Sequence, residues 1–188
     1  MDERKRLYLA YGSNINLTQM KYRCPAAVPL MPAELKDYTL AFRGGGVATI
    51  LPEKDSFVPC LLWSITPACE QSLDRYEGYP NLYHKEMVTI TIPYDNKPIV
   101  VMVYVMDEKN KEPCMPPDFY YWGIMEGYEQ NGMDTKPLEA ALKRTWQEIR
   151  KCKEQMPIRA EKKPDAHCNY RESKLSLIHI SEPTRLAL

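Results

Sequence analysis

The chain has 188 residues, of which 44% are hydrophobic and 27% charged, a composition typical of one globular domain with its own core. Its 25 Lys and Arg balance its 25 Asp and Glu, so charge gives no reason to expect a nucleic acid or an anionic membrane as partner. No apolar run reaches the roughly 18–20 residues of a membrane span, and the charged start lacks the apolar core of a signal peptide. We therefore expect a cytoplasmic protein.

The first predicted elements are a strand and a short helix. Residues 7–11 are apolar or aromatic, which predicts a buried strand, and the polar turn at 12–14 interrupts it. Asn16 is a favourable N-cap residue, and Gln19 follows it at the spacing of a capping box. We predict a helix over residues 17–23 that ends before a proline.

Strand-like segments follow on either side of a triple glycine. Residues 35–43 favour a strand, and glycines 44–46 permit positive φ or a close approach of another backbone. Strand character resumes at residues 47–51 and again at 58–65. These segments predict a sheet.

A second helix is predicted from clear signals at both ends. Thr66 offers a capping hydroxyl, and Pro67 suits the first helical position. The helix should continue to Glu77, because Gly78 supplies a C-terminal stop.

The remaining elements complete one mixed domain. Residues 83–92 and 98–106 predict a hairpin around residues 95–97. Two helices are expected over residues 118–130 and 137–155. The whole pattern favours an α+β domain with a curved or closed sheet.

The end of the chain has a different character. The segment LSLIHISEPTR at residues 175–185 resembles the translation of a common sequencing adapter. We therefore expect one domain over residues 1–174 and a non-native, disordered tail over residues 175–188. A natural polar tail is the alternative.

The turn that follows the first strand is a candidate ligand-binding loop. After Tyr11, Gly12 lets the backbone turn sharply, and the amides of Ser13 and Asn14 can converge on a bound anion. A plain turn that ends the strand is the competing interpretation, and spacing alone favours it.

Glu77 is a candidate proton shuttle. A carboxylate in the last turn of a helix faces the negative end of the helix dipole, which disfavours its charged form. Partial burial would raise its pKa further, toward values that suit general acid–base catalysis. An exposed helix-end glutamate beside Arg75 is the competing interpretation.

Other candidates carry weaker signals. Tyr104 lies on a predicted strand and Tyr120 at the start of a predicted helix, where each could line a pocket or belong to the core. His84 has no suggestive partner and fits a surface or packing role. Six scattered cysteines without a CxxC pair indicate reduced thiols, and no HExxH or clustered ligands indicate a metal site.

Three motifs occur together in a recognisable order. They are LAYGSN at residues 9–14, GGVATI at 45–50 and SLDRYEG at 72–78. In this order they resemble the γ-glutamylcyclotransferase family, and the resemblance extends over about residues 7–132.

The resemblance implies a fold and a set of site residues. The fold would be a small mixed β-barrel flanked by helices. The backbone at Tyr11, Gly12, Ser13 and Asn14 would hold the γ-glutamyl group. Glu77 would be the catalytic acid/base, and Tyr104 and Tyr120 would be the pocket tyrosines.

The implied reaction converts a γ-glutamyl amino acid or peptide to 5-oxoproline and the free amino acid, as in glutathione metabolism. The substrate's own α-amine is the nucleophile, so orientation supplies much of the rate. One glutamate can take the proton of the α-ammonium and return it to the leaving amine. The loop amides can stabilise the oxyanion or hold the α-carboxylate. This acyltransferase-type lyase chemistry needs no metal and no cofactor.

Several alternatives stay open. A γ-glutamylamine cyclotransferase, or an enzyme that deprotects a biosynthetic γ-glutamyl intermediate, would keep the fold, although Ser13 and Asn14 favour the amino-acid or peptide branch. A non-catalytic ligand-binding module on the same fold is the second alternative, against which Glu77 argues. A thiol hydrolase using Cys60 or Cys69 is the third.

The expected partner is a small γ-glutamyl substrate. Residues 77–83 form a segment one residue shorter than in the animal enzymes of the family, so the leaving group stays open. The oligomeric state is also open, with a homodimer among the options.

Overall fold

The structure is a computed structural model that describes residues 5–92 and 96–155. Residue 95 of the predicted hairpin turn and the predicted tail at 175–188 lie outside the described residues. The strands are β1 (Arg6–Ala10), β2 (Val28–Arg43), β3 (Val47–Ile65), β4 (Tyr83–Thr91) and β5 (Pro98–Met106). The helices are α1 (Leu17–Arg23), α2 (Pro67–Tyr76), α3 (Asp118–Gln130) and α4 (Lys136–Gln155), with 3₁₀ turns at Ser13–Ile15 and Glu108–Asn110.

The strands form one mixed sheet in the order β2-β3-β1-β5-β4. The central strand β1 is antiparallel to β3 and parallel to β5, and β4 is antiparallel to β5. The predicted α+β class is confirmed. The predicted barrel needs correction: no ladder among the described residues joins the edge strands β2 and β4, so the sheet is open.

The hairpin of β2 and β3 differs from the prediction in its length. The predicted segments 47–51 and 58–65 are two paired halves of one strand, β3. Residues 53–56 between them have no ladder partner on β2, although the Asp55 amide donates to Asp37 Oδ1 at 3.1 Å. The register shifts between Lys36 and Tyr38, where Asp37 has a φ of 62°. β2 begins at Val28 rather than at residue 35. The sequence did not reveal its first half because those residues are mostly exposed and carry no apolar pattern.

The helix boundaries follow the predicted caps. The side chain of Asn16 accepts a hydrogen bond from the Gln19 amide at 3.0 Å and begins α1. The second half of the capping box is absent, since the Gln19 side chain accepts from Arg23 instead. Thr66 caps α2 in the same way, and Gly78, with a φ of 64°, follows its end.

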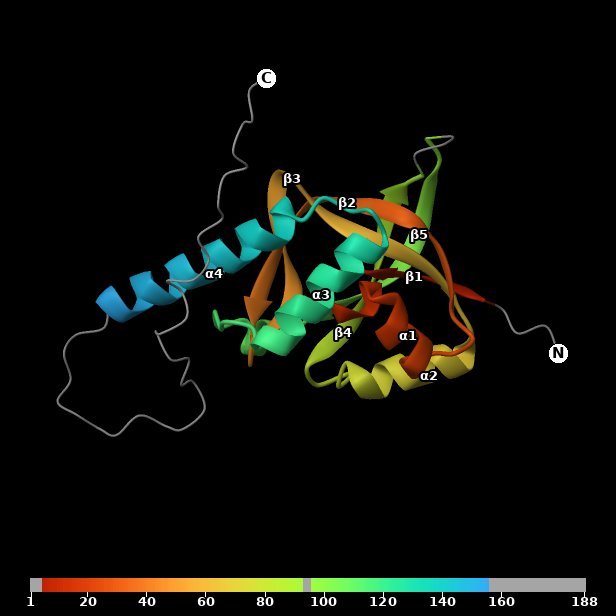
Figure 1. The fold of residues 1–188 in the computed structure, drawn as a ribbon, viewed down its shortest axis with the longest axis horizontal. Coiled ribbons are helices and arrows are strands. Elements are labelled where there is room, and N and C mark those ends of the chain that lie inside the picture. The colour runs from red at the N-terminus through yellow and green to blue at the C-terminus, as the bar shows by residue number, and fades with distance from the viewer. Residues whose placement is uncertain (1–4, 93–95, 156–188) are drawn as a thin grey trace, which may run out of the picture. The chain divides into compact units, whose positions relative to one another are not determined.

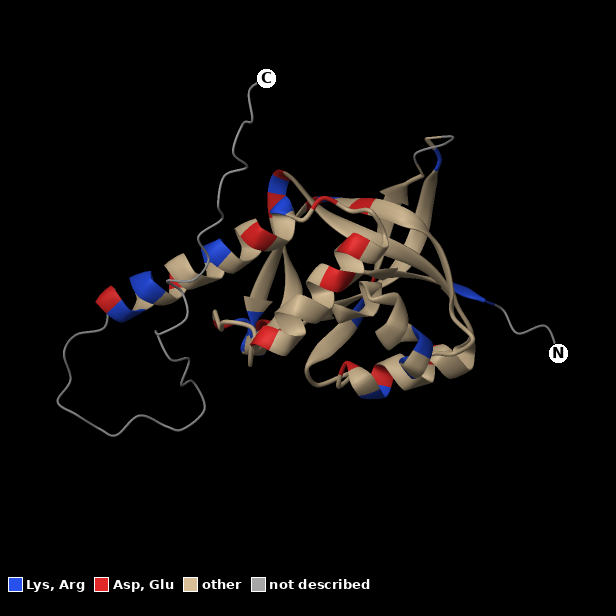
Figure 2. Cartoon of the chain, viewed as in Figure 1, with Lys and Arg blue, Asp and Glu red and all other residues tan. Residues whose placement is uncertain are grey.

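The arrangement of the elements is visible in Figure 1, where α3 crosses one face of the sheet beside α1, and α2 lies next to α1. α4 packs against β2. The core combines inward side chains of the sheet with side chains of all four helices, among them Met20 of α1, Leu73 of α2, Ile124 of α3 and Leu138 of α4. Figure 2 shows Lys and Arg interspersed with Asp and Glu along α2 and α4. Among the described residues, no helix combines the length and apolarity needed to cross a bilayer.

Candidate active site

A cavity of about 240 Å³ lies where the end of β1 meets α2, β4, β5 and the start of α3. Its walls are dominated by phenol side chains, and among the described residues that line it one side chain, that of Glu77, is a carboxylate. The lining tyrosines are Tyr8, Tyr11, Tyr76, Tyr83, Tyr104 and Tyr120. This volume lies below the roughly 300–1,000 Å³ of pockets for drug-sized ligands, which fits a small ligand.

The sequence-predicted site residues all lie around this cavity. Tyr11 and the turn 12–14 come from the end of β1, and Glu77 from the end of α2. Tyr104 comes from β5 and Tyr120 from the first turn of α3. The fold therefore brings together side chains that are more than 90 residues apart in the chain, as the hydrogen bond between the Tyr11 hydroxyl and the Tyr104 carbonyl oxygen, at 2.7 Å, illustrates.

Glu77 is the C-cap residue of α2, in helical geometry with φ −79° and ψ −4°. Its own amide donates to the carbonyl oxygens of Leu73 and Arg75, so the carboxylate lies at the negative end of the helix. Burial raises the pKa of Glu77 to about 7, although the hydrogen bond from Asn14 and the positive charge of Arg23 act to lower it. Near neutral pH this carboxyl group therefore exists in both protonation states.

The turn after β1 approaches the cavity with its backbone. A Cβ atom at Gly12 would lie 3.3 Å from the Cβ of Ala48 and 3.4 Å from the Tyr120 hydroxyl. Glycine therefore leaves the space between the turn and these two residues free of a side chain. The turn closes through a hydrogen bond from the Ile15 amide to the Gly12 carbonyl. Within the described ranges, the amides of residues 13 and 14 have no protein acceptor, as expected at the start of a helical turn.

Asn14 links the turn to Glu77. Its side-chain amide donates to Glu77 Oε1 at 2.7 Å and to the Tyr8 hydroxyl at 2.9 Å. Its Oδ1 accepts from the guanidinium of Arg23 at 2.6 Å, and the same guanidinium donates to Ser13 Oγ at 3.0 Å. The carboxylate is thus held by the loop that also supplies the free amides.

Two tyrosines fix the strand that faces the turn. The Tyr83 hydroxyl donates to the carbonyl oxygen of Ala48 at 2.6 Å, and the Ala48 amide donates to the Tyr120 hydroxyl at 3.1 Å. Burial raises the pKa of both tyrosines, so both phenols stay protonated. Because the Tyr120 oxygen accepts from the backbone, its own proton can be directed elsewhere.

Tyr104 is oriented by a charged network outside the cavity. Its hydroxyl donates to Asp74 Oδ1 at 2.6 Å, and Asp74 pairs with Lys85 at 2.7 Å. Lys85 also pairs with Glu70, which in turn contacts Arg6. Burial and the neighbouring Asp74 raise the pKa of Tyr104, so this phenol also stays neutral.

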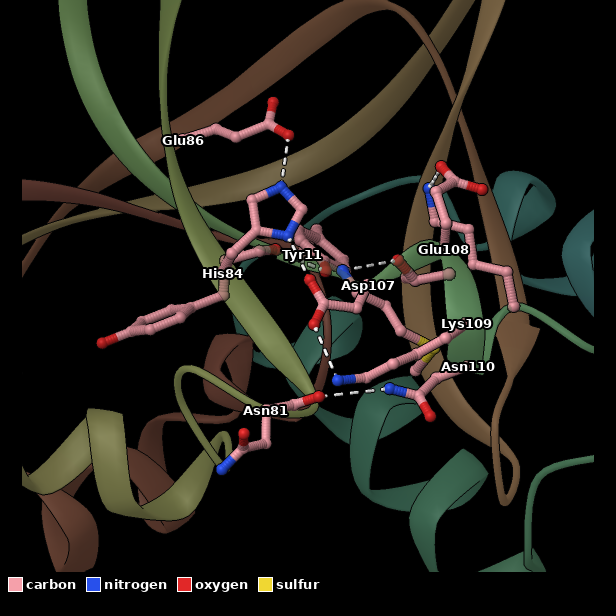
Figure 3. A network of polar contacts seen from close by, with 12 residues as sticks. Tyr11, Asn81, His84, Glu86, Asp107, Glu108, Lys109 and Asn110 are labelled. Atoms are coloured by element: carbon pink, nitrogen blue, oxygen red, sulfur yellow. Dashed lines mark hydrogen bonds and ion pairs between the residues drawn. The ribbon is translucent and has the colours of Figure 1, made fainter.

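The loop between α2 and β4 forms one rim of the cavity through Leu82. The amide of Asp107 donates to the Leu82 carbonyl oxygen at 3.0 Å, and the Asn110 side chain donates to the Asn81 carbonyl oxygen at 3.3 Å. Figure 3 shows the ring of His84 between Glu86 and Asp107, beside these contacts. Hydrogen bonding to Glu86 raises the pKa of His84.

The triple glycine precedes another part of the cavity wall. Gly46 has a φ of 84°, and a Cβ there would lie 2.3 Å from the carbonyl oxygen of Met115, so this glycine has both features that the triple glycine was expected to permit. The next two residues, Val47 and Ala48, line the cavity.

Other candidates lie elsewhere. Cys60 and Cys69 are buried and do not line the cavity, and burial raises the pKa of Cys60. His84 is partly exposed and outside the lining, which agrees with the predicted surface or packing role. Across residues 5–92 and 96–155, no group of three or more His, Cys, Asp or Glu side chains is arranged to hold a metal ion.

Sequence reasoning missed several residues of the site. Arg23 ends a short helix, and Asp74 is a partly buried residue within another, so neither stands out from a pattern. Tyr8 and Tyr83 lie in predicted strands and were indistinguishable from core aromatics. The one usable signal was the high count of 13 tyrosines, several of which gather here.

Comparisons with known proteins agree with this architecture. The family model "Gamma-glutamyl cyclotransferase, AIG2-like" matches residues 8–122. Gamma-glutamylcyclotransferase from Homo sapiens is 30% identical over 148 residues, 73% of this chain and 76% of its own. The protein of the same name from Bos taurus is 30% identical over 143 residues, 71% of this chain and 73% of its own.

A solved structure named "Gamma-glutamyl cyclotransferase" superposes with a TM-score of 0.64 at 25% identity, over 73% of this chain and 86% of that one. The matched residues 8–122 include the turn after β1, the end of α2, Tyr104 of β5 and Tyr120 of α3. Sequence, fold and relatives agree, and the chain belongs to the γ-glutamylcyclotransferase, AIG2-like family.

Proposed function

We propose that this protein is a γ-glutamylcyclotransferase that converts γ-glutamyl amino acids or peptides to 5-oxoproline and the free amino acid or peptide. The observation that carries the proposal is Glu77, a carboxyl group whose pKa burial raises to about 7, which lines a small cavity together with the turn at residues 12–14 and accepts a hydrogen bond from Asn14 of that turn at 2.7 Å. A group that is both acid and base near neutral pH suits two opposite proton transfers.

The proposed reaction is an intramolecular acyl transfer. Glu77 removes a proton from the substrate's α-ammonium, and the freed amine attacks the γ-carbonyl carbon to form the ring C–N bond. As the tetrahedral oxyanion collapses and the original amide C–N bond breaks, Glu77 returns this proton to the leaving amine. The ring nitrogen, which still carries two hydrogens, loses one of them to the same carboxylate, and the released amine takes it up to become an ammonium. No atom is exchanged with water.

The surrounding groups have separate proposed roles. The amides of Ser13 and Asn14 hold the oxyanion or the α-carboxylate, because backbone donors of a fixed turn need no reorganisation. The Tyr120 hydroxyl donates its proton to the substrate, and Tyr104 forms part of the cavity wall beside the turn. The neutral phenol walls orient the glutamyl group so that amine and carbonyl meet.

The test is an incubation with γ-glutamyl dipeptides, γ-glutamylamines and glutathione, followed by mass spectrometry. The proposal expects 5-oxoproline in equal amount to the freed amine from at least one dipeptide. If only the γ-glutamylamines were converted, the protein would be a γ-glutamylamine cyclotransferase instead. No 5-oxoproline from any member of the panel, with folded protein, would favour a binding module and reject the proposal.

An N-acetylated γ-glutamyl dipeptide is the matched control. Acetylation removes the nucleophile while the γ-amide is unchanged, so we expect no cleavage. Release of the amino acid from this compound would contradict intramolecular attack and indicate hydrolysis.

A further inference from the structure

Arg23, on the last turn of α1, does not line the cavity but contacts residues that do. Its side chain is half-buried and donates four hydrogen bonds, to Ser13 Oγ (3.0 Å), Asn14 Oδ1 (2.6 Å), Gln19 Oε1 (2.6 Å) and the Tyr76 hydroxyl (2.5 Å). The guanidinium also stacks on the Tyr76 ring, 3.7 Å from its centroid. All of these partners are neutral.

A partly buried arginine usually pairs with a carboxylate. None of the ion pairs formed within residues 5–92 and 96–155 includes Arg23. Its hydrogen bonds instead lead to a carboxylate indirectly, from Arg23 to Asn14 and from Asn14 to Glu77.

The direction of these bonds is fixed by chemistry. A guanidinium can donate but cannot accept, so the side-chain oxygen of Asn14 must face Arg23. The amide nitrogen then has to face the other way, where its two hydrogens reach Glu77 and Tyr8. Without Arg23 the amide could turn over, and its oxygen would then face the carboxylate of Glu77.

We propose that Arg23 is a positioning residue for Glu77: it locks the Asn14 amide in the donating orientation and supplies the positive charge that the ionised carboxylate requires. This inference rests on the proposed function for its effect on turnover, whereas its effect on Glu77 itself does not depend on any activity.

The other groups around Glu77 are neutral. The cavity around it is lined by phenols from several elements, namely Tyr8 and Tyr11 from β1 and its end, Tyr76 from α2, Tyr83 from β4, Tyr104 from β5 and Tyr120 from α3, while β3 contributes the uncharged Val47 and Ala48. Lys85 is paired with Glu70 and Asp74. Burial raises the pKa of Glu77, and the Asn14 bond and the Arg23 charge lower it, so loss of Arg23 should raise that pKa.

The test compares Arg23→Met with Lys21→Met, which removes an exposed positive charge from the same helix. Protein labelled with ¹³C at the glutamate carboxyl carbons is titrated by NMR, and the Glu77 signal is assigned with Glu77→Gln. We expect the Glu77 pKa to rise by about one unit in Arg23→Met and to stay unchanged in Lys21→Met. The Asn14 side-chain amide signals of the unaltered protein should titrate with the same midpoint as Glu77.

Kinetics provide the second readout. The acid limb of kcat/KM should move to higher pH by the same unit in Arg23→Met, with turnover at pH 7 about fivefold lower and largely recovered at pH 9. Arg23→Lys keeps the charge and should show a smaller shift, which also serves if the methionine variant fails to fold.

Two results would overturn the inference. An unchanged Glu77 pKa in both Arg23 variants would exclude Arg23 as its counter-charge, whether or not the protein makes 5-oxoproline. A raised KM with an unchanged pH profile would instead assign Arg23 to the substrate carboxylate. Failure of the proposed function alone would leave the NMR result intact, so the two failures are distinguishable.

Discussion

At Glu77, burial and hydrogen bonding act in opposite directions. Burial favours the neutral acid, whereas the Asn14 amide and the Arg23 charge favour the carboxylate, and the balance leaves the pKa at about 7. A fully exposed glutamate would be too acidic to reprotonate a leaving amine well, and a glutamate buried without donors would be too weak an acid to ionise near neutral pH. The site therefore needs both influences.

This balance predicts a pH-dependent cost in stability. The pKa of Glu77 is about 7 in the folded state and about 4.3 in an unfolded chain, so the folded protein binds the proton more tightly and loses stability as the pH rises between these values. Glu77→Gln removes this loss. We expect the free energy of unfolding of the variant to exceed that of the unaltered protein by about 1–2 kcal/mol above pH 7, after allowance for screening by cavity water. Below about pH 4 this effect should vanish.

Denaturant unfolding at unit intervals from pH 4 to 8 measures this difference. Glu129→Gln is the matched control, because Glu129 is exposed on α3. A stability difference between Glu77→Gln and the unaltered protein that is the same at every pH would contradict the assigned pKa.

The sequence indicated Glu77 but not the residues that tune it. Its place before Gly78 at the end of a capped helix is a local signal, which a sequence displays directly. Arg23 and Asp74 act through partners that the fold brings to them, and Arg23 meets Tyr76 across 53 residues of sequence. Such contacts leave no periodic pattern, so sequence analysis could not find them.

At the scale of elements, α2 positions the carboxylate of Glu77 at the cavity. Thr66 caps its start, with the hydroxyl accepting from the Cys69 amide at 3.2 Å, and Gly78 ends it directly after Glu77. Both boundaries were predicted because caps and stops are local chemistry. The extent of β2 was not, because its exposed first half is held by pairing with β3 rather than by burial.

The glycine turn between β2 and β3 gives a test at this scale. Gly46→Ala would place a Cβ 2.3 Å from the Met115 carbonyl oxygen at a φ of 84°, whereas Gly45→Ala has a similar φ of 81° and nothing within 4 Å. Both changes carry the cost of positive φ, about 1 kcal/mol. Gly46→Ala should therefore cost at least 1–2 kcal/mol more.

Thermal or denaturant unfolding of the two alanine variants measures this gap. Because residues 47 and 48 line the cavity, Gly46→Ala should also weaken turnover more than Gly45→Ala does. Equal losses of stability in the two variants would show that the close approach to Met115 has no energetic weight.

At the scale of the whole molecule, the site exists only because distant segments converge. The central strand β1 pairs with both β3 and β5, and this places the turn after β1 beside Tyr104 and the rim of β4. The class of the fold could be predicted from the order of the elements. The absence of pairing between the described edge strands β2 and β4 could not be predicted, since closure of a sheet depends on strand tilt and stagger that a sequence does not display.

The most direct test of the account is the rate of 5-oxoproline formation by Glu77→Gln, measured under single-turnover conditions with the best dipeptide of the panel. Glutamine keeps the shape and can still accept the Asn14 hydrogen bond, but it cannot exchange a proton near neutral pH. The account predicts a loss of about 10²-fold or more with Tm held or raised, while Glu129→Gln keeps full activity. A folded Glu77→Gln variant that forms 5-oxoproline at nearly the normal rate would contradict it.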